Sequence, residues 1–179
     1  METRVENKTE IISSRDGVVF LIDDNPIYLS ILEEEILKLM PNVSVFLFDC
    51  GEKALKKMDL DPFLVFLDYD LGGDPDKIMN GINVLKKIKA QNNETEVVML
   101  SGANDVNIIT TSIKQGAYDF IYKSEKSMDD VKHKTKAILR KLRLKEERND
   151  LSETKLYLKW VAILLVAVCT MGIYFYEEL

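Results

Sequence analysis

The feature that most limits how this chain can fold is a series of five short apolar runs. Each run is followed by a segment with apolar residues at helical spacing. The first runs from Val18 to Ile22, and the others lie at 43–48, 63–67, 97–100 and 118–122. Runs of this length suit strands that are buried on both faces, and helices between such strands are typical of a parallel sheet with right-handed crossovers. The sequence therefore predicts an α/β fold with five repeated strand and helix units.

The helices of these units are expected at 27–40, 51–58, 82–90 and 105–115, with the last helix beginning near Ser127. Pro26 suits the first turn of a helix, and Pro41 ends the helix that follows. The chain of 179 residues has the length of one ordinary domain plus an appendage. We expect a flexible tail at 1–16, a globular domain at 17–130, a charged helical stalk at 131–155, a transmembrane helix at 156–176 and a short non-cytoplasmic end at 177–179.

The charge and the cysteine residues limit the kinds of partner and compartment. A net charge of -6 provides no general basic surface for nucleic acid, so we expect no nucleic-acid partner. Because a stalk and an anchor are predicted after the fifth unit, we also expect no DNA-binding output domain. Cys50 and Cys169 have no evident way to pair, which suits a reducing compartment. The first 16 residues contain no apolar signal-peptide segment, so we expect the globular part to remain in the cytoplasm.

Polar residues that can carry chemistry follow four of the five predicted strands. Asp23 and Asp24 follow the first strand, and Asp68 follows the third. Ser101 follows the fourth strand and Lys123 follows the fifth. Ligands bind beyond the carboxyl ends of the strands in an open parallel sheet, and the flavodoxin-like order 2-1-3-4-5 makes the first and third strands neighbours. We therefore expect all five side chains on one rim.

Three carboxylates in one hollow repel each other and require a cation or a shared proton at neutral pH. Oxygen ligands in small number suit Mg²⁺, with water completing its coordination. Such a cation could bridge a phosphoryl group on one carboxylate, while Ser101 donates to one phosphoryl oxygen and Lys123 pairs with another. The pattern predicts an acyl-phosphate site.

These residues and their positions resemble the receiver domain of bacterial response regulators, over residues 17 to about 130. By this resemblance Asp23 and Asp24 match the acidic pair that binds Mg²⁺, and Asp68 matches the phosphoacceptor. Asp70 matches the residue whose backbone carbonyl is a further metal ligand. Ser101 matches the hydroxyl residue that responds to the phosphoryl group, and Lys123 matches the lysine of the family motif. Phe120 falls at the aromatic switch position, and the segment Gly116 to Phe120 is similar to the family's usual lead into that lysine.

The resemblance implies a function in two-component phosphorelay signalling. Asp68 would accept a phosphoryl group from a histidine kinase or a phosphotransfer protein in a Mg²⁺-dependent step. Ser101 would then move toward the phosphoryl group, Phe120 would turn inward, and a surface for an unknown output protein would change. Apart from its own phosphorylation and dephosphorylation, we expect the chain not to be an enzyme.

Two features depart from the family pattern. Ser124 follows the lysine, where the family usually has proline, often after a cis bond that would cost a serine about 3 kcal/mol. The connection from Asp68 to Gly81 is longer than usual and lacks the usual Met-Pro pair. Within it, Asp74 and Asp76 suit either a solvated loop or additional cation contacts.

The segment from Trp160 to Tyr176 contains no charged residue. A helix from Leu156 to Tyr176 would be about 31 Å long, enough to cross a bilayer once. Trp160 at one end and Tyr174 with Tyr176 at the other resemble interfacial aromatic belts. Lysine and arginine residues precede the segment, so the positive-inside rule predicts a single-pass protein of the bacterial inner membrane with the globular domain in the cytoplasm.

Other interpretations of the sequence remain open. Ala137, Leu144, Leu151 and Leu158 recur every seven residues, which provides half of a coiled-coil seam and at most weak homodimerisation. The basic stalk could instead contact anionic lipid. For the domain, one alternative is a membrane adaptor that folds as a receiver without being phosphorylated. Another is a phosphohydrolase of the haloacid dehalogenase type, since Asp68-Tyr69-Asp70 resembles its first motif.

Overall fold

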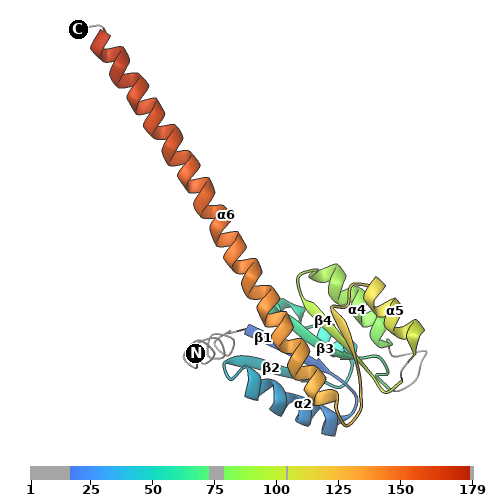
Figure 1. Ribbon diagram of the computed structural model, residues 1–179. Coiled ribbons are helices and arrows are strands. Elements are labelled where there is room, and N and C mark those ends of the chain that lie inside the picture. The colour runs from blue at the N-terminus through green and yellow to red at the C-terminus, as the bar shows by residue number, and fades with distance from the viewer. Residues whose placement is uncertain (1–16, 73–78, 104, 178–179) are drawn as a thin grey trace. The chain divides into compact units, whose positions relative to one another are not determined.

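The apolar runs form one sheet in the computed structural model, which describes residues 17–72, 79–103 and 105–177, with side chains up to residue 164. Its strands are β1 (Gly17–Ile22), β2 (Val43–Phe48), β3 (Leu64–Asp68), β4 (Glu96–Ser101) and β5 (Asp119–Tyr122). All neighbouring strands are parallel and their order is β2-β1-β3-β4-β5 (Figure 1). The predicted sheet and its strand order are therefore confirmed.

The helices that follow the strands lie close to their predicted positions. They are α2 (Pro26–Leu39), α3 (Gly51–Leu55), α4 (Gly81–Gln91), α5 (Val106–Lys114) and α6 (Ser127–Glu177). The prediction of one helix over 51–58 is wrong, because α3 ends at Leu55 and a separate 3₁₀ helix covers Met58–Leu60. Two backbone hydrogen bonds here join residues three apart, as in a 3₁₀ helix, instead of four apart as in an α-helix. They run from Lys57 N–H to the Ala54 carbonyl and from Leu60 N–H to the Lys57 carbonyl.

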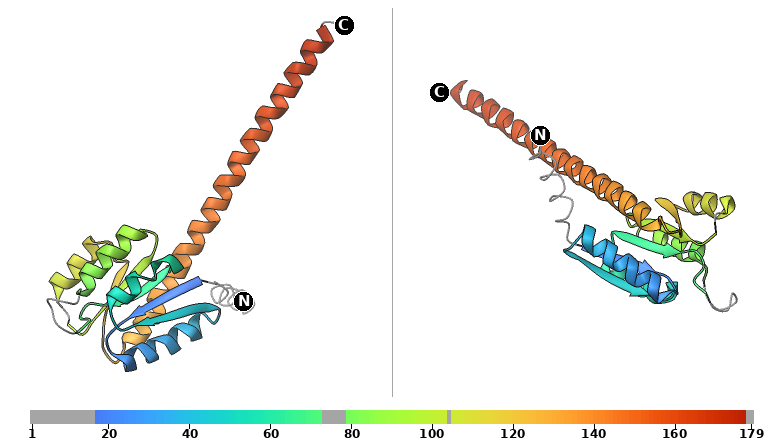
Figure 2. Two further views of the ribbon diagram at one scale, coloured as in Figure 1. Left: turned by 180° about the vertical axis from the view of Figure 1, so that it is seen from behind. Right: turned by 60° about the horizontal axis from the view of Figure 1, so that its bottom comes forward.

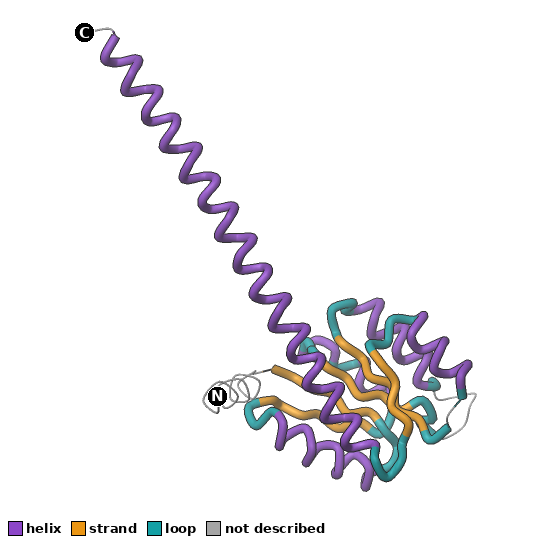
Figure 3. The backbone as a smooth tube through the Cα atoms, in the orientation of Figure 1, coloured by secondary structure: helices purple, strands orange, loops and turns teal. Residues whose placement is uncertain are grey.

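Helices cover both faces of the sheet (Figures 2 and 3). One face carries Phe20, Val65 and Leu67, which belong to an apolar cluster with residues of α3 and α4. The alternate side chains Leu21 and Phe66 are fully buried on the other face, where α2 and the first turns of α6 lie (Figures 1 and 2). Burial on both faces explains why these strands are continuously apolar in sequence.

The chain divides into two compact units, Met1–Ile138 and Leu139–Leu179. The second unit consists largely of the later part of α6. Apolar side chains along it are exposed, among them Leu151 at 56% and the predicted membrane residues Leu156 at 57% and Trp160 at 64%. Within the part of the chain whose side chains are described, no helical stretch has the length and apolarity needed to cross a bilayer. Most of the predicted span, including Tyr174 and Tyr176, lies outside that part, so the span stays a prediction.

Candidate functional site

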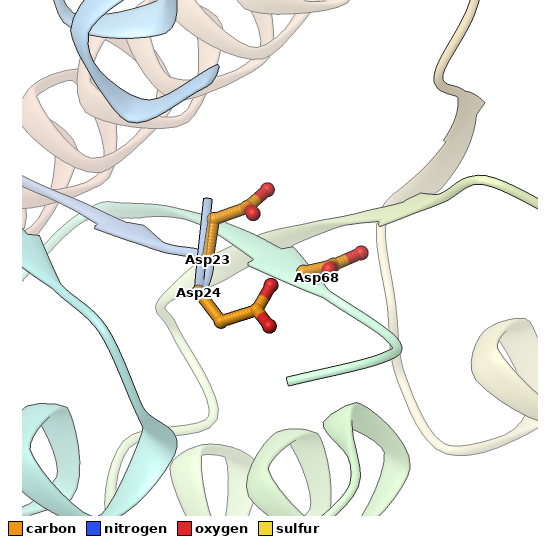
Figure 4. A group of neighbouring side chains, drawn as sticks. All are labelled: Asp23, Asp24 and Asp68. Carbon is orange, nitrogen blue, oxygen red and sulfur yellow. The ribbon is translucent and has the colours of Figure 1, made fainter. Parts of the chain in front are cut away.

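The residues predicted to share one rim all lie at the carboxyl ends of strands. Asp23 and Asp24 follow β1, and Asp68 is the last residue of β3. Because β1 and β3 are parallel neighbours, the structure brings these carboxylates together (Figure 4). One oxygen from each lies within 4.8 Å of the others. The sequence contained enough information to predict this cluster, which we call the carboxylate rim.

Lys123 follows β5 and reaches back across the sheet to the carboxylate rim. Its Nζ lies 2.6 Å from Oδ2 of Asp23 and 2.9 Å from Oδ2 of Asp68. Its backbone N–H donates to the Ser101 carbonyl at 2.8 Å, which fixes the base of the side chain. One ammonium therefore neutralises part of the charge of two buried carboxylates.

Burial and neighbouring charges change the titration of this site. Burial raises the pKa of Asp68 to about 6, against the lowering effect of the hydrogen bond from Lys123, and the charges of Asp23 and Asp24 raise it further. Burial alone would lower the pKa of Lys123, but the hydrogen bonds to Asp23 and Asp68 raise it above its usual value. The ammonium thus stays charged while Asp68 holds its proton more tightly than an ordinary aspartate.

The donor set fits a small divalent cation. Asp23 is fully buried, and its Oδ1 accepts from the Asn25 N–H at 3.0 Å. Within the described residues, the one group in contact with Oδ2 of Asp23 that the ion pairs show is the Lys123 ammonium, at 2.6 Å. Carboxylate oxygens from three side chains that lie within 4.8 Å of one another are the kind of ligand that Mg²⁺ prefers. Asp23, Asp24 and Asp68 would hold such an ion.

Glycine at position 72 leaves space for one of these carboxylates. Gly72 has a φ of +64°, a conformation that residues with a side chain rarely adopt. A Cβ atom built there would lie 2.2 Å from Oδ2 of Asp24. The backbone after β3 can therefore approach the carboxylate of Asp24 only because residue 72 has no side chain.

The remaining predicted site residues are Ser101, Phe120 and Asp70. Ser101 ends β4, is 2% exposed, and its Oγ accepts from the Ala103 N–H at 3.1 Å. Phe120 in β5 is partly buried against the main apolar cluster. Asp70 is exposed and its side chain does not belong to the carboxylate cluster. The role predicted for its backbone carbonyl stays a prediction.

The two departures from the family pattern are Ser124 after the lysine and the long connection after Asp68, and the structure describes the first of them fully. None of the peptide bonds between described residues is cis, so Lys123 and Ser124 are joined by a trans bond. The Ser124 carbonyl accepts from the Ser127 N–H at 3.0 Å, which leads directly into α6. By contrast, Asp74 and Asp76 lie outside the described residues, and their predicted roles stay open.

Sequence reasoning missed two residues next to the site. Glu52 accepts the Met79 N–H at 2.9 Å and so holds the end of the connection between β3 and α4. Tyr28, near the start of α2, has its ring 4.7 Å from Nζ of Lys123. No local pattern marks either role, because each depends on a contact between segments far apart in sequence.

Comparison with known proteins gives one consistent family. Residues 19–135 match the family model of the response regulator receiver domain. The nitrogen assimilation regulatory protein NtrX of Azorhizobium caulinodans is 37% identical over 92 residues, which are 51% of this chain and 19% of NtrX. The chemotaxis protein CheY of Listeria monocytogenes is 31% identical over 104 residues, which are 58% of this chain and 83% of CheY. The chain thus matches about half or less of the length of the first curated relatives, NtrX and the regulator NarL of Escherichia coli at 52%.

Solved structures agree with this result. NtrX from Brucella abortus is 29% identical, with a TM-score of 0.65 and coverage of 76% of this chain and 30% of NtrX. The BeF3-activated DrrB receiver domain is 24% identical, with a TM-score of 0.61 and coverage of 70% of this chain and 99% of that domain. The likeness to DrrB concerns the fold alone.

Proposed function

Because this chain belongs to the response regulator receiver domain family, we propose that Asp68 is the phosphoacceptor of a two-component phosphorelay and that Mg²⁺ is required for its phosphorylation. The observation that carries the proposal is the carboxylate rim, with Lys123 Nζ 2.9 Å from Asp68 and 2.6 Å from Asp23. The phosphoryl donor would be a histidine kinase or a phosphotransfer protein.

The residues around Asp68 divide the work of phosphoryl transfer. A carboxylate oxygen of Asp68 attacks phosphorus and forms a new P–O bond, while the bond between phosphorus and the donor breaks. The Lys123 ammonium is already at the carboxylate and is placed to pair with a phosphoryl oxygen as negative charge gathers there. A bound Mg²⁺ would supply positive charge that offsets the repulsion between the rim and the incoming phosphoryl group.

A conformational response follows from the positions of Ser101 and Phe120. Phosphorylation adds about -1.5 to -2 charge units to the rim. The hydroxyl of Ser101 then leaves the Ala103 N–H and donates to a phosphoryl oxygen, and Phe120 turns inward into the vacated space. The surface of α5 and β5 changes and presents a different face to an output protein.

The C-terminal part of the chain is proposed to anchor this switch at a membrane. Support comes from the sequence, where no charged residue occurs between Trp160 and Tyr176 and seven lysine or arginine residues lie between Arg140 and Lys159. A single span would keep the receiver domain on the cytoplasmic side of a bacterial inner membrane, with output by protein contact.

The test of phosphorylation uses acetyl phosphate as the donor, with and without Mg²⁺, and intact mass as the readout. We expect a Mg²⁺-dependent gain of one phosphoryl group that is absent in Asp68→Ala. The matched control is Asp70→Ala, which removes a neighbouring exposed carboxylate but keeps the backbone carbonyl that is proposed to bind Mg²⁺. It should be phosphorylated like the unmodified chain.

A folded chain that gains no phosphoryl group would contradict the proposal. In that case the domain would be an adaptor that signals by binding alone. Turnover of a small phosphate ester, rather than one stable modification, would instead favour the phosphohydrolase interpretation.

A further inference from the structure

We propose that Tyr28 is a positioning residue that holds the Lys123 ammonium at the carboxylate rim and links it to the first turn of α6. The aromatic ring and the hydroxyl group of Tyr28 contribute separately. The role of the ring rests on the proposed phosphorylation of Asp68, whereas the contact itself can be measured without it.

The ring of Tyr28 is a further contact of the Lys123 ammonium, beside its two carboxylate partners. Nζ of Lys123 lies 4.7 Å from the ring centroid, within the distance of a cation–π interaction. The lysine side chain is 19% exposed, so little water competes for this position. During phosphorylation Nζ has to exchange an Asp68 oxygen for a phosphoryl oxygen, and the ring of Tyr28 and the Asp23 carboxylate are contacts whose charge does not change in that exchange.

The backbone of Tyr28 is fixed where this contact requires it. Asn25 is the N-cap of α2, and its Oδ1 accepts from the N–H groups of Ile27 at 3.0 Å and Tyr28 at 3.2 Å. The same Asn25 donates its own N–H to Asp23 of the carboxylate rim. The start of α2 therefore sets the position of the ring relative to the carboxylates.

The hydroxyl of Tyr28 reaches a second element. It donates to Oγ of Ser127 at 3.5 Å, and Ser127 is the first residue of α6 and is 2% exposed. Burial raises the pKa of the Tyr28 phenol, against the lowering effect of this hydrogen bond, so the hydroxyl remains protonated and able to donate. A shift of Lys123 toward a phosphoryl group is therefore passed through Tyr28 to the beginning of α6.

The ring is tested with Tyr28→Leu and Tyr28→Phe in the full chain, purified in a mild detergent. Phosphorylation by acetyl phosphate should slow about fivefold in Tyr28→Leu and change less than twofold in Tyr28→Phe, because phenylalanine keeps the ring. The Mg²⁺ affinity, measured by NMR titration, should stay the same in both variants. Equal slowing in both variants, or no slowing in either, would overturn the role of the ring, and so would a parallel loss of Mg²⁺ affinity.

The contact is also read directly, which separates it from the phosphorylation of Asp68. In the unphosphorylated chain, the ring current of Tyr28 should shift the ε-methylene protons of Lys123. This shift should disappear in Tyr28→Leu and persist in Tyr28→Phe. If the unmodified chain accepts no phosphoryl group, this shift still decides whether Tyr28 positions Lys123, and its absence would overturn the proposal.

The link to α6 is tested with Tyr28→Phe and Ser127→Ala. Each should abolish the change in amide shifts that phosphorylation produces in the first turn of α6, at 127–130, while phosphorylation itself proceeds. The matched control is Ser124→Ala, which removes another hydroxyl from the same loop. The Ser124 hydroxyl accepts from the Lys126 N–H and not from Tyr28. Amide shifts that change as in the unmodified chain in both test variants would overturn the link.

Discussion

Two regions of this chain depart in opposite directions from the usual distribution of side chains between interior and surface. At the carboxylate rim, the ionisable residues Asp23 and Asp68 are 0% and 4% exposed. Along the second unit, the large apolar residues Leu158 and Ile163 are 59% and 58% exposed. The buried charges have an opposite charge, Lys123, within their own unit. Those two apolar side chains remain mostly exposed among the described residues.

The largest expected effect is at the exposed apolar side chains. Replacing Ile163 and Leu164 together by arginine should move the full chain from the membrane fraction to the soluble fraction of cells. Two arginines at the centre of a span cost about 5–7 kcal/mol of insertion free energy. Glu153→Arg with Thr154→Arg adds arginines outside the apolar segment and should leave the chain in the membrane fraction. An arginine variant that stays with the membrane would contradict the proposed anchor.

The next largest effect is expected at Lys123, whose ammonium pairs with the buried carboxylates of the rim. Lys123→Met should lower the free energy of unfolding by about 3 kcal/mol at pH 7 without Mg²⁺, because it leaves buried carboxylates unpaired. Mg²⁺ should restore part of this loss, which chemical denaturation with and without the ion would show. Lys53→Met is the control, since it breaks an ion pair with Asp49 in which both side chains are 62% exposed, and it should have little effect. Equal losses in the two variants would mean that burial does not distinguish the pairs.

A smaller effect of opposite sign is expected when a buried charge is removed. The folded-state pKa of Asp68 is about 6 and its unperturbed value is 3.8, so the folded chain binds more protons than the unfolded chain between these values. The ionised carboxylate therefore opposes folding at pH 7, and this cost disappears as the pH falls below the lower value. Asp68→Asn should raise the free energy of unfolding by on the order of 2 kcal/mol at pH 7 without Mg²⁺. A gain that does not shrink toward pH 4 would exclude the carboxylate charge as its cause.

The smallest effect is expected at Glu52, a carboxylate that has a hydrogen-bond donor. The Met79 N–H lowers the pKa of Glu52 below its usual 4.5, so its ionised form stabilises the fold above that pH and the benefit is lost as the pH falls through the lower folded-state pKa. Glu52→Gln keeps an acceptor but loses the charge, and should cost about 1 kcal/mol at pH 7 and nothing well below pH 4.5. Denaturation at both pH values measures this difference. A cost that is the same at both would show that the amide disturbs packing.

The sequence predicted the sheet and the carboxylate cluster because both follow from local signals combined with one rule of topology. Apolar runs mark buried strands, and parallel strand order then brings Asp23 near Asp68. The sequence did not predict contacts that depend on side-chain packing between segments far apart in the chain. The contact of Tyr28 with Lys123 and the bond from the Met79 N–H to Glu52 are of this kind. The break between α3 and the following 3₁₀ helix was missed because Lys56 and Lys57, which lie between them, are not residues that mark the end of a helix.

The order of the strands also has a consequence for synthesis. The chain leaves the ribosome from its N-terminus, so β1 and β3 emerge before β5 and Lys123. A nascent chain that pairs β1 with β3 therefore collects three carboxylates while their ammonium partner is not yet available, and their repulsion opposes that pairing. We expect the sheet to close late, in one step when the fifth strand arrives, rather than strand by strand as translation proceeds.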